Sequence, residues 1–188
     1  MSSRYLYLAR HGEAIDEGEL SPVGRRQAEL LGERLAGVPL TSIAHGPLPR
    51  AAATAAIVAA RLPGVPVTVS EVADDYVPFL PDPPPPALAG EVADESRAAA
   101  ALDRYARPSL VELHELVITH SFQVAWFLRA ALGAPPERWI GLNAANAALT
   151  VIRYRPDRDP AVLMFNDMSH LPPELCWTGF PDALRVPA

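Results

Sequence analysis

A short apolar segment near the start of the chain most constrains its fold. Residues 5–9 read Tyr-Leu-Tyr-Leu-Ala and are apolar throughout. This is the pattern of a strand that is covered on both faces, as in a sheet with helices packed on either side. The segment runs directly into Arg-His-Gly-Glu at residues 10–13. Because ligands of open α/β sheets bind beyond the carboxyl ends of the strands, this junction indicates a functional site.

The next segments alternate between helix and strand patterns. Ser21-Pro22 is typical of a helix start, and this helix is expected to run to about residue 36. A strand is expected over residues 41–44, a helix from 49 or 50 to about 61, and a strand over 65–70. The resulting β-α-β-α-β order predicts a parallel sheet with crossover helices.

The later part of the chain is less regular but remains within one expected domain, residues 1–188. Residues 76–90 contain a proline-rich run that is either a stiff connector or one wall of a pocket, and the sequence favours neither. The other expected elements are a helix over 91–107, a strand over 116–119, a helix over 121–132, two strands joined like a hairpin near 148–155 and 161–165, and a tail from 166 that packs over the sheet.

Composition excludes several classes of protein. The formal net charge of −6 and the pI near 5.3 argue against nucleic acid as a main partner. All 16 basic residues are arginine, which excludes a Walker A loop and Schiff-base chemistry. Cys176 is the only cysteine, so no disulfide or cysteine zinc cluster can form within the chain. No secretion signal or uncharged membrane-length run is present, so a cytoplasmic protein without membrane contact is expected.

Two arginines and two histidines are expected to converge at the carboxyl edge of the sheet. Arg10 and His11 end the first strand, His120 follows the apolar run 116–119, and Arg50 opens the second helix. Arginine matches phosphate oxygens with a planar fork, and a neutral imidazole attacks phosphorus well. Fixed cations around the equatorial oxygens supply much of the catalysis of phosphoryl transfer. The cluster therefore predicts a pocket for a phosphoryl group that needs neither a metal nor a cofactor.

A leaving alkoxide also needs a proton donor. Glu71, Asp74 and Asp75 follow the third strand and are the candidate acids, and spacing alone does not choose among them. Glu13 and Ser121 are candidates for the pocket rim, while His45 and His170 fit a rim position or a structural one equally well. Gly24 and Gln27 are expected to be structural. Asn143 and Asn146 either reach the pocket or end turns, and the structural role is favoured.

Four motifs together resemble the histidine phosphatase superfamily, the phosphoglycerate-mutase-like proteins. The resemblance covers nearly the whole chain and implies a three-layer α/β/α sandwich around a mostly parallel sheet. Within the superfamily, the chain looks closest to the branch of the mitochondrial serine/threonine protein phosphatase. The superfamily motifs stand at residues 10–13, 20–28, 47–55 and 117–121, and the segments shared with that branch at 62–65, 81–84, 135–139, 143–150 and 171–173.

The resemblance also implies residue roles. His11 would be the nucleophile, Arg10, Arg50 and His120 the phosphate ligands, and Asp75 the proton donor. Asp75 is a departure, because the superfamily has a glutamate there. The function so implied is a phosphatase that hydrolyses phosphoproteins or small phosphate esters through a phosphohistidine intermediate. A phosphoglycerate-type mutase and a catalytically weak phosphate-binding module remain as alternatives.

Overall fold

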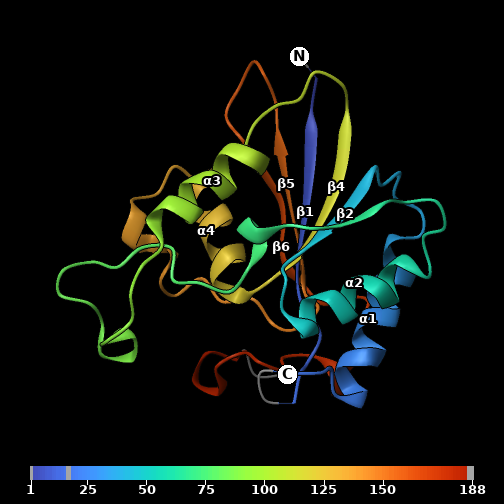
Figure 1. Ribbon diagram of the computed structural model, residues 1–188, viewed down its shortest axis with the longest axis horizontal. Helices are drawn as coiled ribbons and strands as arrows, with labels where there is room; N and C mark the ends of the chain where they lie inside the picture. Colours follow the sequence, from blue (N-terminus) through green and yellow to red (C-terminus); the bar gives the residue numbers. More distant parts are fainter. Residues whose placement is uncertain (1, 16–17, 186–188) are drawn as a thin grey trace.

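The computed structural model describes residues 2–15 and 18–185. Within them, six strands form one sheet in the order β3-β2-β4-β1-β5-β6 (Figure 1). Strands β1 to β4 are parallel to one another, and β5 runs antiparallel to both β1 and β6. The strands are β1 (Arg4–Arg10), β2 (Ser42–His45), β3 (Val67–Val69), β4 (Leu113–Thr119), β5 (Leu149–Tyr154) and β6 (Ala161–Asp167).

Helices cover both faces of the sheet. Helices α1 (Pro22–Leu35) and α2 (Pro49–Ala59) lie on one face, and α3 (Glu95–Tyr105) and α4 (Ser121–Ala131) lie on the other (Figure 1). Separate cores form on the two faces, and both consist of apolar side chains from strands and helices. The predicted three-layer sandwich with a mostly parallel sheet is therefore confirmed. None of the helices in the described ranges has the length and apolar character that crossing a bilayer requires.

Two expected boundaries differ most from the structure, each for a local reason. Helix α3 begins at Glu95 rather than residue 91, because the Asp94 side chain caps it by accepting a hydrogen bond from the backbone N–H of Arg97 at 2.9 Å. Strand β4 begins at Leu113, three residues before the apolar run that predicted it. Its Glu115 is polar but forms a buried ion pair with Arg4 of β1 at 3.2 Å, which allows the strand to extend.

The register of the central strands brings distant segments together. In the parallel pair β1 and β4, Arg10 lies opposite Thr119, so His11 and His120 follow neighbouring strand ends. The backbone N–H of His11 donates to the carbonyl of Thr119 at 2.9 Å, which extends the pairing by one residue. Both histidines therefore stand at the carboxyl edge of the sheet, as predicted.

The last segment of the chain lies at this same edge. Strand β6 continues to Asp167, and residues 168–185 cross below the strand ends instead of packing on a face of the sheet (Figure 1, red). Gln27 of α1 anchors them, since its Nε2 donates to the carbonyl of Leu175 and to Oγ1 of Thr178, both at 2.8 Å. The expectation that the tail covers the sheet is corrected accordingly.

Candidate active site

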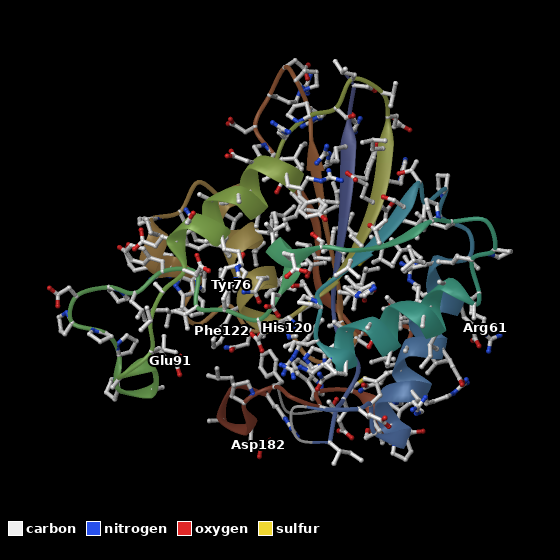
Figure 2. The ribbon with its side chains drawn as sticks, in the orientation of Figure 1. Arg61, Tyr76, Glu91, His120, Phe122 and Asp182 are labelled. Carbon is white, nitrogen blue, oxygen red and sulfur yellow. The ribbon has the colours of Figure 1, made fainter. Side chains whose placement is uncertain are left out.

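The predicted cluster lines a cavity at the carboxyl edge of the sheet. The cavity measures about 440 Å³, and Arg10, His11, Arg50 and Asp75 all line it. A smaller cavity of about 170 Å³ shares three of these residues and adds His120, Ser121 and Phe122. Figure 2 shows His120 and Phe122 close together at the start of α4. The four residues predicted to surround a phosphoryl group thus line two cavities that share Arg10 and His11.

Close backbone packing holds the His11 ring in one orientation. Its Nδ1 lies 2.7 Å from the carbonyl oxygen of Gly12. Because a carbonyl can only accept, Nδ1 carries the proton and Nε2 keeps its lone pair. A Cβ atom at residue 12 would lie 2.4 Å from the carbonyl oxygen of Gly24, so this approach requires glycine. The ring is therefore held in the tautomer that a nucleophile at Nε2 needs.

Both histidines are neutral in the free protein. Their ring centroids are 5.0 Å apart and both side chains are buried. The pKa of His11 is lowered to about 2, mainly by burial and then by the nearby His120 and Arg10. The pKa of His120 is lowered to about 3, mainly by burial and then by the positive charges of Arg50 and Arg10. A neutral imidazole at neutral pH is the nucleophilic form.

Arg10 supplies a buried positive charge. Burial lowers its pKa to about 10, so the guanidinium stays protonated at neutral pH. Its Nη1 donates to the carbonyls of Ala144 at 2.9 Å and Gly179 at 2.6 Å. These bonds fix the group, while its buried Nε has no hydrogen-bond partner among the described residues. An anion in the cavity would satisfy this donor.

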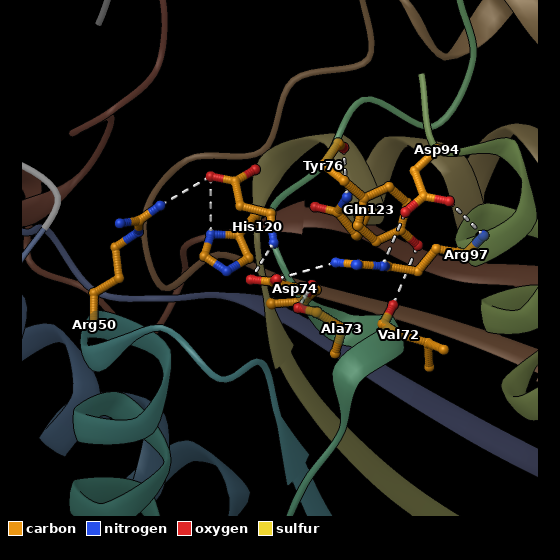
Figure 3. Close-up of polar contacts among 11 residues, drawn as sticks. Arg50, Val72, Ala73, Asp74, Tyr76, Asp94, Arg97, His120 and Gln123 are labelled. Carbon is orange, nitrogen blue, oxygen red and sulfur yellow. Dashed lines mark hydrogen bonds and ion pairs between the residues drawn. The ribbon is translucent and has the colours of Figure 1, made fainter. Parts of the chain in front are cut away.

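The structure separates the three candidate acids. Asp75 lies in the cavity, where its Oδ2 is 2.9 Å from Nη2 of Arg50 and 3.4 Å from Nδ1 of His120 (Figure 3). Asp74 points away and pairs with Nη1 of Arg97 at 3.1 Å. Glu71 is exposed and lines neither cavity. Only Asp75 is therefore placed to reach a bound phosphate ester.

A network behind the cavity holds Asp75 in place. Oδ1 of Asp74 accepts a hydrogen bond from the backbone N–H of Asp75 at 2.8 Å, and Oδ2 of Asp74 pairs with Arg97. Nε of Arg97 lies 3.1 Å from Oδ2 of its helix cap, Asp94 (Figure 3). The amide of Gln123 donates to the carbonyl of Tyr76 at 2.8 Å. Helices α3 and α4 thus orient the segment that carries the acid.

The rim candidates divide into two pairs. Glu13 lines the larger cavity, and its Oε1 accepts a hydrogen bond from Oγ of Ser21 at 2.7 Å. Ser121 lines the smaller cavity. His45 and His170 line neither one, so their placement at the rim is not supported. The Nδ1 of His45 instead contacts the carbonyl of Gly46 at 2.8 Å, much as His11 contacts its own glycine.

Two further residues line the larger cavity. For Asn146 the sequence favoured a structural role over a place in the pocket; its Nδ2 donates to the carbonyl of His11 at 2.9 Å, and it also lines the larger cavity. Gly179 reaches the cavity from the last segment of the chain, and no local pattern indicated this. Among the described residues, no group of three or more histidine, cysteine or acidic side chains could hold a metal ion.

A three-layer sandwich with this cluster at its carboxyl edge defines a phosphoglycerate-mutase-like protein. The chain belongs to the histidine phosphatase superfamily. The model of that family described as "Histidine phosphatase superfamily (branch 1)" matches residues 6–75 and 71–168. The family predicted from the four motifs is therefore confirmed.

Its relatives include the expected branch. The mouse serine/threonine-protein phosphatase PGAM5, mitochondrial, is 30% identical over 189 residues, which cover 92% of this chain and 66% of the mouse protein. The Caenorhabditis elegans Pgam5 protein is 33% identical over 186 residues, covering 92% and 66% respectively. The chain thus spans just under two thirds of the length of these relatives. Both are named as mitochondrial, which contradicts the expectation of a cytoplasmic protein.

Solved structures agree on the fold. A mutant phosphoserine phosphatase from Entamoeba histolytica, in complex with phosphoserine, has a TM-score of 0.70 at 21% identity and covers 89% of this chain and 99% of its own. A phosphoglycerate mutase from Plasmodium falciparum has a TM-score of 0.66 at 21% identity and covers 92% and 96%. Phosphatases and mutases therefore share this architecture.

Proposed function

We propose that residues 1–188 form one phosphatase domain that hydrolyses phosphate monoesters without a metal, through a phosphohistidine intermediate. The observation that carries the proposal is the neutral His11 ring beside two guanidinium groups. Its Nδ1 is bound to a carbonyl, and within the described residues its Nε2 has no hydrogen-bond partner. A nucleophile and fixed cations around one cavity are the two parts that phosphoryl transfer requires. Phosphoproteins and small phosphate esters are the proposed substrates.

The proposed first step forms a bond between Nε2 of His11 and phosphorus as the ester bond breaks. Arg10, Arg50 and His120 bind the equatorial oxygens, where negative charge spreads in the transition state. Asp75 delivers a proton to the leaving oxygen, which departs as an alcohol. In the second step the Asp75 carboxylate takes a proton from water, the water oxygen attacks phosphorus, and phosphate leaves with His11 restored.

The aspartate in place of glutamate bears on this mechanism. Aspartate is one methylene shorter, so it reaches the substrate only if its backbone stands closer. Its contacts with Arg50 at 2.9 Å and His120 at 3.4 Å support such a reach. This geometry favours an active phosphatase over a module that only binds phosphate.

A steady-state assay tests the proposal. With an aryl phosphate and excess chelator, the protein should release phosphate, and His11→Ala should lower kcat by about a thousandfold or more. His45→Ala is the matched control, because His45 also follows a strand and contacts the next glycine carbonyl, at 2.8 Å, yet lines neither cavity. Activity that needs a metal, or that survives in His11→Ala, would overturn the proposal. Phosphoryl transfer between phosphoglycerates without net hydrolysis would favour a mutase.

A further inference from the structure

An apolar cavity of about 260 Å³ lies beside the catalytic one. Its walls come from three segments: Leu88 after the proline-rich run, Phe122 of α4, and residues 139–143 after α4. Among the described residues, the side chains that line it are uncharged and mostly apolar, and Asn143 supplies an amide. The catalytic cavity, in contrast, is lined by arginine, histidine and aspartate.

One residue belongs to both spaces. Phe122 lines this apolar cavity and also the smaller catalytic cavity, which Asp75 and His120 line as well. The Phe122 ring thus forms part of the wall of both cavities. A group bonded to the leaving oxygen would reach the apolar surroundings by passing this ring.

Packing keeps the apolar cavity in shape. The rings of Phe122 and Trp139 meet edge to face, with centroids 4.9 Å apart. The indole Nε1 of Trp139 donates to the carbonyl of Phe79 at 2.9 Å, so the one polar atom of the ring is already paired. Leu88 and Leu142 are half-buried against the same core cluster as these rings. A preformed apolar pocket of this kind binds apolar groups at little reorganisation cost.

The proline-rich segment now has a role. The short 3-10 helix Pro86–Leu88 places Leu88 in the wall of the cavity. Residues 76–90 line neither catalytic cavity, so the segment forms a wall of this apolar cavity and not of the phosphate pocket, which was one of the two readings that the sequence left open.

We infer that this apolar cavity is the subsite for the leaving group, and that the preferred substrates are phosphate monoesters whose alcohol carries a bulky apolar group. The inference rests on the proposed phosphatase function. The phosphate would bind among the arginines and histidines, and the apolar group would lie against Phe122 and Leu88. An ester with a small or charged alcohol would leave the cavity unused and gain none of this binding energy.

A pair of alkyl phosphates tests the inference. Ethyl phosphate and 2-phenylethyl phosphate have leaving alcohols of similar acidity and differ in the apolar ring. We expect kcat/KM to be about tenfold or more higher for the phenylethyl ester. Ile140→Ser places a hydroxyl in the subsite wall and should reduce this ratio about threefold or more. A second comparison uses two phosphoserine peptides, one with phenylalanine and one with glycine beside the phosphoserine. It tests whether kcat/KM shows the same preference for an apolar group when the substrate is a phosphopeptide.

The matched control is Leu163→Ser. Leu163 lines a separate apolar cavity of the same volume, about 260 Å³, at the edge strand β6, and none of that cavity's residues belongs to the catalytic site. This variant should leave the ratio unchanged. Equal kcat/KM for both esters and both peptides, or the same loss of ratio in the two variants, would overturn the inference while leaving the phosphatase intact. Failure to hydrolyse any of the four substrates would overturn the proposed function itself.

Discussion

The two neutral histidines should make the folded state strongly sensitive to acid. A histidine in the unfolded chain titrates with a pKa near 6.5, whereas burial and the nearby guanidinium groups lower the pKa of His120 to about 3. Between these values the unfolded state binds one more proton than the folded state. Stability from this residue is therefore fully present above about pH 6.5 and is lost as the pH falls toward 3.

The size of the effect follows from proton linkage. Each excess proton in the unfolded state costs about 1.4 kcal/mol per pH unit. For His120 the loss in the free energy of unfolding between pH 6 and pH 4 is about 2.5 kcal/mol, and it hardly depends on how far below 4 the folded pKa lies. The buried His11, whose pKa is lowered to about 2, contributes in the same direction.

The perturbation is His120→Gln, measured by urea unfolding at several pH values between 4 and 6 in phosphate-free buffer. Carboxyl groups also titrate in this range, so the comparison is between the slopes of the free energy of unfolding in the variant and in the wild type. The average slope between pH 4 and pH 6 should be lower in the variant by about 1.25 kcal/mol per pH unit, whatever its overall stability. Parallel slopes would mean that His120 is protonated in the folded state, and the assignment of a neutral pair of rings would fail.

Two further predictions concern the proton donor. Asp75→Asn should lower kcat by roughly a hundredfold or more for an alkyl phosphate. The loss should be much smaller for a nitrophenyl phosphate, because its leaving group needs no proton. Equal losses of kcat for the two substrates would mean that another residue is the proton donor. Arg97→Ala should lower kcat for the alkyl ester about three- to tenfold with little change in KM, because Arg97 acts through Asp74 on the backbone of Asp75. Arg97→Lys should restore part of the lost kcat. A change in KM alone would refute this positioning role.

The residues that follow central strands could be predicted from the sequence. His11 and His120 each come directly after an apolar run, and parallel pairing brings such strand ends to one edge. The choice of Asp75 could not be made from spacing, since it depends on Asp74 being paired with Arg97 of a helix about twenty residues further along the chain. Local sequence does not encode which of two adjacent carboxylates has a partner elsewhere.

Parts of the site that irregular segments form could not be predicted from the sequence either. Gly179 lines the cavity because the last segment is anchored to Gln27. The anchoring hydrogen bond joins Gln27 to the carbonyl of Leu175, which lies 148 residues further along the chain. The apolar cavity combines Leu88 with Phe122 and residues 139–143, none of which shares a periodic pattern with the others. Such sites depend on how loops pack on the sheet, whereas the sheet itself follows from strand and helix periodicity.

The most direct test is to identify the atom that receives the phosphoryl group. The protein is mixed with ³²P-labelled substrate and acid- or base-quenched within one turnover, and the labelled peptide is sequenced by mass spectrometry. The mechanism predicts a base-stable, acid-labile phosphoryl group on Nε2 of His11, because Nδ1 is bonded to the carbonyl of Gly12. Label on Nδ1 of His11, on another residue, or nowhere while product still forms would contradict it.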